Sequence, residues 1–147
     1  MLLLQKVYRF LAFRDRSEKE IRGFLKGSEK IDEIIDKLKE QGLLDDEKFA
    51  KAWVESRRRS KQKGVKALKL ELWQKGIDKE IIEEVTRVEC LESSEEQTAE
   101  KALDKKAKAW QKLETMDFRK KAFGFLMRKG FEFEIVKKAV DNFLKKG

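Results

Sequence analysis

A recurring stripe of apolar residues at helical spacing is the feature that most constrains how this chain folds. Residues 31–38 place isoleucine and leucine at i, i+3, i+4 and i+7, the pattern of an amphipathic helix. The apolar triplet within 34–38 recurs 47 residues later within 81–85, and again a further 54 residues later within 135–139. Periods of this length are typical of stacked helical units that share their apolar faces.

A second helix precedes each stripe and repeats with the same two offsets. The matching pairs are Ile21 and Leu25, Leu68 and Leu72, and Ala122 and Leu126. Further upstream, apolar residues recur at helical spacing within 4–11, 49–54 and 99–113. We therefore predict nine helices in three repeats of three, and we place the repeats at 1–43, 44–92 and 93–147. No strand is expected, because no stretch alternates apolar and polar residues over strand length.

Composition narrows the functional classes. Charged residues make up 44% of the 147 residues and proline is absent, which favours helices with narrow apolar stripes and charged faces. Histidine is also absent, which excludes a Ser-His-Asp triad, a Cys-His pair and a histidine metal site. The single cysteine, Cys90, cannot form an internal disulfide or a multi-cysteine zinc site. We expect neither catalysis nor a cofactor.

The N-terminal apolar run is short. Residues 1–4 are apolar, but Gln5 and Lys6 interrupt the run before it reaches the length of a signal-peptide core or a bilayer span. The expectation is a soluble, cytoplasmic protein with no membrane association, and we expect it to be a monomer.

Predicted helix boundaries carry capping signals. Capping boxes are expected at Ser17–Glu20 and Ser94–Gln97. Asp45, Asp78 and Asp117 stand just ahead of apolar-periodic runs and are expected to be N-caps. The glycines expected to end helices are Gly27, Gly42, Gly76 and Gly130. Asp45 and Asp46, with Glu47, also form the densest carboxylate cluster, where magnesium binding is the alternative; we interpret both aspartates as caps without a metal.

The strongest electrostatic feature lies within a net charge of +8. The segment 57–69, called here the basic segment, contains seven basic side chains and no acidic one. They are Arg57, Arg58, Arg59, Lys61, Lys63, Lys66 and Lys69. A solvated helix end is one interpretation, but this density of like charge favours contact with an anionic partner. A second basic stretch, residues 101–112, is interpreted as a solvated helix face.

Aromatic residues raise the question of base stacking. Trp53, Trp73 and Trp110 each lie within or beside the apolar pattern of a helix, so we expect all three in the core. Phe131 is expected to dock a helix turn into the third repeat. Phe133 lies off the apolar stripe of its helix, so its exposure would be informative.

Several motifs together resemble one known family. Gly42-Leu43-Leu44-Asp45-Asp46-Glu47-Lys48-Phe49-Ala50 resembles the signature of the RecX regulatory proteins. Gly64 and the segments 71–77, 125–131 and 11–21 continue the resemblance in the same order. It implies an all-α, elongated and slightly curved array of three tandem three-helix repeats.

The resemblance also implies a function. RecX proteins bind the RecA recombinase and its filaments on single-stranded DNA, and they usually inhibit filament growth, ATP hydrolysis and strand exchange in recombination and DNA repair. They are not enzymes. Two alternatives remain open: a basic helical module that acts directly on DNA, such as a transcription regulator, and a purely structural scaffold. The scaffold would leave the basic segment unexplained. The abundance of Lys and Glu suits phosphate contact or solvation better than base reading.

Overall fold

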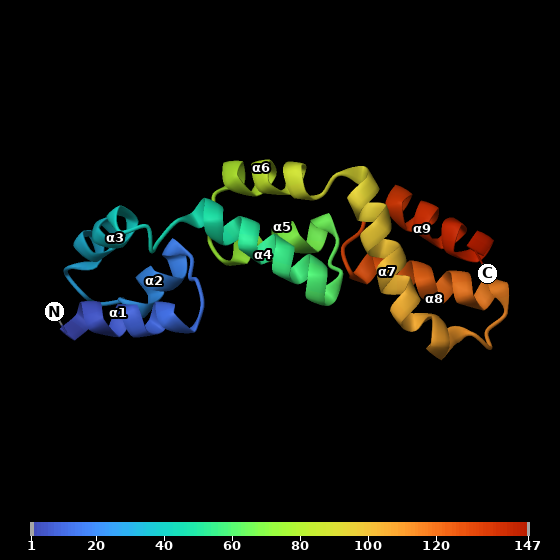
Figure 1. Cartoon of the computed structure of the whole chain (residues 1–147), viewed down its shortest axis with the longest axis horizontal. Helices are drawn as coiled ribbons and strands as arrows, with labels where there is room; N and C mark the ends of the chain where they lie inside the picture. Colours follow the sequence, from blue (N-terminus) through green and yellow to red (C-terminus); the bar gives the residue numbers. More distant parts are fainter. Residues whose placement is uncertain (1, 147) are drawn as a thin grey trace. The chain divides into compact units, whose positions relative to one another are not determined.

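The computed structural model describes residues 2–146, and this part of the chain forms nine α-helices and no strand, as predicted (Figure 1). The helices are α1 (Leu2–Phe13), α2 (Glu18–Phe24), α3 (Ile31–Glu40), α4 (Asp46–Lys61), α5 (Val65–Gln74), α6 (Lys79–Glu89), α7 (Glu92–Trp110), α8 (Thr115–Arg128) and α9 (Phe133–Lys146). Among them, none is both long and apolar enough to cross a bilayer.

The chain divides into two compact units. Unit 1 contains the chain up to Trp53 together with Glu71–Val85, and unit 2 contains Val54–Leu70 together with the chain from Thr86 onward. The division passes through α4, α5 and α6, so each of these helices contributes residues to both units.

The core of unit 1 forms where the first three helices meet. Its buried members come from the predicted stripes and from the loop after α3. They are Val7, Ile21, Leu25, Ile34, Ile35, Leu38 and Leu44. The capping box that starts α2 is confirmed: the Glu20 amide donates to the Ser17 hydroxyl at 3.3 Å, and the Ser17 amide donates to the Glu20 carboxylate at 3.1 Å.

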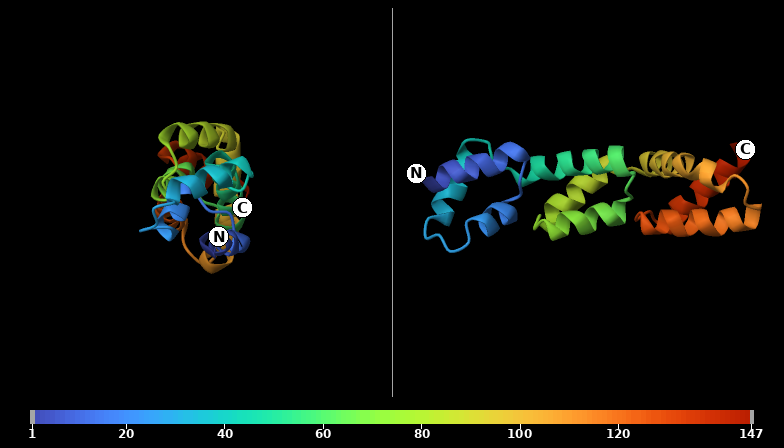
Figure 2. Two further views of the ribbon diagram at one scale, coloured as in Figure 1. Left: turned by 90° about the vertical axis from the view of Figure 1, so that its left-hand side faces the viewer. Right: turned by 90° about the horizontal axis from the view of Figure 1, so that it is seen from below.

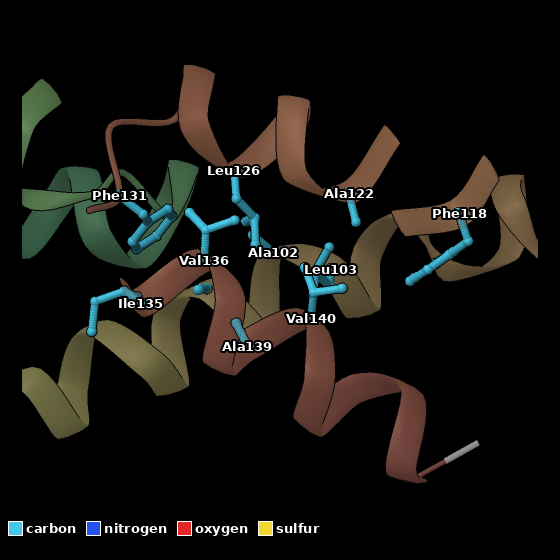
Figure 3. Close-up of a cluster of buried hydrophobic side chains, with 11 residues drawn as sticks. Ala102, Leu103, Phe118, Ala122, Leu126, Phe131, Ile135, Val136, Ala139 and Val140 are labelled. Atoms are coloured by element: carbon cyan, nitrogen blue, oxygen red, sulfur yellow. The ribbon is translucent and has the colours of Figure 1, made fainter. Parts of the chain in front are cut away.

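The core of unit 2 lies where α7, α8 and α9 pack side by side (Figure 2). Small residues on α7 and α9, including Ala99, Ala102 and Ala139, allow these helices to approach closely. Phe131, fully buried, inserts from the α8–α9 turn beside Leu126 and Val136, which confirms the predicted docking role (Figure 3).

Helix ends confirm some of the predicted caps and contradict others. The four predicted glycines all have positive φ, between 72° and 93°. The Asp45 carboxylate accepts from the amides of Glu47 and Lys48 at 3.0 and 3.2 Å, as an N-cap does. The predictions for Ser94 and Asp117 are wrong, because α7 begins at Glu92 and α8 at Thr115, which places both residues inside helices.

The tryptophan prediction also needs correction. Trp53 and Trp110 are half-buried, but Trp73 has 68% of its surface exposed. The helical pattern of α5 points Leu68 and Leu72 inward, and Trp73 follows Leu72 by a step of about 100°, which turns it outward. Phe133 is also exposed, at 54%, and its ring lies 6.0 Å from that of Phe123.

Candidate partner-binding surface

The turn between α4 and α5 sets the geometry of the basic segment. Lys61 ends α4, and Gln62 then takes a left-handed φ of 48°. The side-chain amide of Gln62 donates a hydrogen bond to the Arg59 carbonyl at 2.8 Å. Gly64 follows, and its amide donates to the Lys129 carbonyl at 2.8 Å. The turn is thereby fixed against the turn that links α8 to α9.

The seven basic side chains of the segment differ in their surroundings. Arg59, Lys61 and Lys66 are exposed, and Lys66 pairs with Glu132 at 3.3 Å. Arg57, Lys63 and Lys69 are half-buried. Arg59, Lys61 and Lys63 form no ion pair with any residue among 2–146, which leaves their charges open to a partner.

Arg58 differs from the other six, because its side chain is largely buried and is paired within unit 2. The Arg58 side chain is 11% exposed, and its guanidinium pairs with the carboxylate of Glu95 on α7, whose side chain is 4% exposed. A second arm of the guanidinium donates to the Ser94 hydroxyl at 3.1 Å. The acid that neutralises Arg58 is 37 residues away in the sequence, so the segment is free of acids along the chain but not in space. Through Glu95 and Ser94, Arg58 links α4 to α7 within unit 2.

Five lysines gather around the turn, and we call them the lysine cluster. Lys61 and Lys63 come from the basic segment, Lys105 and Lys106 from α7, and Lys129 from the residue after α8. The Lys129 ammonium donates to the Lys61 carbonyl. Both Lys106 and Lys129 place their ammonium groups over the Phe125 ring, at 5.5 and 5.3 Å from its centroid. The structure thus joins the first basic stretch to part of the second.

Electrostatics mark Lys129 as the centre of the cluster. Burial lowers the pKa of its ammonium, and repulsion from Lys63, Lys105, Lys106 and Lys61 lowers it further. None of the five lysines pairs with an acid anywhere in the described chain. The cluster is therefore a concentration of positive charge that the protein leaves uncompensated.

A matched pair of structural sites joins successive helix groups. At the first joint, the Asp46 carboxylate of α4 accepts from the Glu18 amide at the start of α2, at 2.9 Å. At the second joint, the Glu95 carboxylate of α7 accepts from the Val65 amide at the start of α5, at 3.1 Å. Asp46 is therefore a cap, as predicted, but of α2 instead of its own helix. Burial raises the pKa of the Asp46 carboxyl.

Two further observations concern chemistry. Within residues 2–146, no three side chains of the His, Cys, Asp and Glu types converge in a way that could hold a metal ion. Burial raises the pKa of the Cys90 thiol, which disfavours the reactive thiolate, although Arg58 opposes the shift.

The fold and this surface define a class: an all-α protein of three-helix repeats that carries an uncompensated cationic surface. Comparison with known proteins gives the family. Residues 45–85 match the second three-helix domain of RecX, and residues 94–140 match the third. The chain belongs to the RecX family of regulatory proteins.

Similar sequences and a similar solved structure support the same family. Regulatory protein RecX of Prosthecochloris aestuarii is 33% identical over 150 residues, covering 96% of this chain and 93% of the relative. Regulatory protein RecX of Bacillus subtilis is 37% identical, covering 90% of this chain and 51% of the relative, so the chain spans about half the length of that relative. The crystal structure of RecX from Lactobacillus salivarius matches with a TM-score of 0.82 at 25% identity, covering 96% and 94% of the two chains.

Proposed function

We propose that this protein binds the RecA recombinase or its filament on single-stranded DNA and inhibits filament growth, ATP hydrolysis and strand exchange. Membership of a family of regulatory proteins supports the proposal. The observation that carries the site is the group Arg59, Lys61 and Lys63, three unpaired cations that surround one turn of unit 2. In this proposal the protein acts without catalysis, in the cytoplasm.

The mechanism needs differential affinity. A protein that inhibits a filament must bind one arrangement of its subunits more tightly than another, because equal affinity shifts no equilibrium. Tandem three-helix repeats offer several contact surfaces on one chain, which makes binding multivalent. The basic segment supplies attraction to acidic groups, and this attraction falls as salt screens it.

The test is the DNA-dependent ATPase of RecA, measured with and without this protein. We expect the wild-type protein to lower the rate. Arg59→Glu, Lys61→Glu and Lys63→Glu together should raise the concentration needed for half inhibition by about tenfold or more, and the wild-type effect should weaken as salt rises. Arg58 is left unchanged, because reversing it would place two acids together inside unit 2.

A matched control separates position from net charge. Lys26→Glu, Lys137→Glu and Lys145→Glu change the charge equally at exposed lysines that form no ion pair in the described chain. Lys138 is unsuitable, because it pairs with Glu92 at 2.5 Å. Equal weakening by both triple variants would show that only net charge matters. Full inhibition by both would place the RecA contact elsewhere, and no effect of the wild-type protein would contradict the proposal.

The repeat boundaries and the oligomeric state are proposed with it. We place the repeats at 1–43, 44–92 and 93–147, supported by the family matches that fall within the second and third of these ranges. We propose that the protein acts as a monomer. Light scattering after size-exclusion chromatography should give a mass near 17.4 kDa.

A further inference from the structure

We infer that the lysine cluster is a binding site for phosphate groups, occupied by consecutive phosphates of a nucleic-acid strand or by a free polyphosphate chain. The inference concerns a ligand of this protein alone and does not require the proposed action on RecA. It rests on contacts within unit 2: the Lys129 ammonium donates to the Lys61 carbonyl, and the ammonium groups of Lys106 and Lys129 lie over the same Phe125 ring. Lys63 and Lys105 are near neighbours of Lys61 and Lys106 in the sequence.

The first argument is that the cluster is built into the structure. The Lys129 ammonium is held by the Lys61 carbonyl and by the Phe125 ring, so it does not swing away from its neighbours. Lys106 lies over the same ring. Backbone bonds reinforce the arrangement, because the amides of Gly64 and Lys66 donate to the carbonyls of Lys129 and Gly130 at 2.8 and 2.9 Å.

The second argument is that the fold leaves this charge uncompensated although acids are abundant. Some lysines elsewhere in unit 2 have acidic partners: Lys66 pairs with Glu132, Lys138 with Glu92, and Lys146 with Glu100 at 3.8 Å. In the cluster, burial and then repulsion from the neighbouring lysines lower the pKa of Lys129. An anion placed among these ammonium groups would remove that penalty, so its binding gains more than contact with isolated surface lysines.

The third argument concerns the kind of anion. Lysine presents a compact point charge that can meet phosphate oxygens from several directions, and clusters of lysine bind phosphates without a bidentate geometry. A ligand must present several charges at close spacing to engage five amines, which a phosphodiester or polyphosphate chain does. The Phe125 ring is already covered by two ammonium groups, so the site favours the backbone over stacked bases.

The experiment measures direct binding of a fluorescent single-stranded oligothymidylate by anisotropy, with no RecA present. If three or four phosphates are engaged, the affinity should fall about 20- to 50-fold between 50 and 200 mM salt. Lys105→Gln with Lys106→Gln should remove about two contacts and reduce the salt slope by about 1.4. Lys137→Gln with Lys145→Gln is the matched control and should leave the slope unchanged. Thermal denaturation checks that both variants fold.

Competition identifies the source of the phosphates. Displacement of the oligonucleotide by inorganic tripolyphosphate supports a free-chain ligand, and displacement only by unlabelled strands supports a nucleic-acid ligand. Equal displacement by polyglutamate at matched charge would overturn the inference in favour of an acidic protein partner. Absence of binding at 50 mM salt, or an unchanged slope in Lys105→Gln with Lys106→Gln, would also overturn it.

A second measurement uses the wild-type protein alone. Acylation of amines followed by mass spectrometry should show that the bound oligonucleotide protects Lys129 and Lys106 but not Lys137. Equal modification of all three would overturn the inference. Because no RecA is present, these outcomes are independent of the ATPase assay: the phosphate site can fail while inhibition of RecA persists, and the reverse also holds.

Discussion

The two joints both connect successive helix groups, but different contacts hold them together. In both, an acid in the first turn of one helix accepts from the first amide of a helix in the preceding group. The first joint adds side-chain contacts: the Ser17 hydroxyl donates to the Lys75 carbonyl at 2.7 Å, and Lys75 pairs with Glu20 at 3.4 Å. The second adds backbone contacts, with the amides of Gly64 and Lys66 donating to the α8–α9 turn.

The space around one glycine at each joint differs in the same way. A Cβ atom on Gly76 at the first joint would lie 2.5 Å from both Cβ and Cδ of Lys19. A Cβ atom on Gly64 at the second joint would lie 2.5 Å from backbone atoms of Gly130 and Phe131. A rotamer change can move Cδ of Lys19 but not its Cβ, so an added methyl group meets a side chain at the first joint and the backbone itself at the second. The lysine cluster surrounds the second joint.

The sharpest test of the comparison removes each capping acid. Glu95→Ala should lower the free energy of unfolding of unit 2 by about 3–5 kcal/mol, because it leaves the Arg58 charge buried without its partner. Asp46→Ala should lower that of unit 1 by only about 0.5–2 kcal/mol, the usual value of a cap. Urea titration of variants that retain only Trp110 or only Trp53 reports each unit separately.

A double variant tests whether the unpaired Arg58 charge causes the loss of stability in Glu95→Ala. Arg58→Met with Glu95→Leu removes both charges and should recover much of the lost stability, since apolar pairs often replace buried ion pairs without loss. Recovery no better than that of Glu95→Ala alone would point to the lost Val65 cap, instead of the unpaired charge, as the cause.

The next largest loss of stability is expected when a glycine at either joint is replaced by alanine. Gly130→Ala combines left-handed strain at a φ of 93° with a collision against Ala67, and it should cost about 2–5 kcal/mol. Gly76→Ala carries similar strain at a φ of 78°, but its Cβ meets side-chain atoms of Lys19 instead of backbone, so its cost should be smaller, about 1–3 kcal/mol. Equal losses in thermal denaturation would show that backbone contact at the second joint adds nothing.

A smaller loss is expected from the cap that serves its own helix. Asp45→Ala removes the acceptor for the amides of Glu47 and Lys48 and should destabilise unit 1 by about 0.5–2 kcal/mol. Asp45→Ser retains an acceptor and should recover most of the loss. Magnesium titration of the wild-type protein should give no stoichiometric, carboxylate-dependent signal.

The mildest effect is a pH dependence of the first joint. A hydrogen bond from Lys39 lowers the pKa of Glu18, and despite opposing burial, hydrogen bonds from Arg14 and the Ser17 amide lower that of Glu20. Their folded pKa values lie below the unfolded ones, so their stabilisation is complete above the unfolded pKa and is lost as the pH falls through the folded values. Asp46, whose pKa is raised, opposes this loss.

The measurement is the urea midpoint of unit 1 between about pH 6 and pH 3. The midpoint should fall as the pH falls, and Glu18→Gln with Glu20→Gln should flatten the curve. Asp46→Asn should instead steepen it, because it removes the opposing contribution. An unchanged curve in the double glutamine variant would show that these ion pairs contribute nothing measurable.

The sequence predicts the helices well because each carries a local signal. Apolar spacing identifies all nine, and the glycines at four helix ends indicate left-handed turns from their residue type and position alone. The site is harder to predict, because its contacts join distant segments. Nothing near Arg58 indicates Glu95, and nothing near Lys61 indicates Lys106 or Lys129. Trp73 shows a related limit, since an apolar residue at the edge of a stripe can face either way.

The cross-helix caps have a consequence for how such a chain tolerates change in length. Only Cys90 and Leu91 separate α6 from α7, and Glu95 must then face the first amide of α5. One extra helical residue would turn Glu95 by about 100° and displace it by about 1.5 Å along the axis. The connector 41–45 is constrained in the same way by Asp46, whereas 25–30 precedes no such acid. Natural insertions and deletions should therefore accumulate at 25–30 and be rare at the other two connectors.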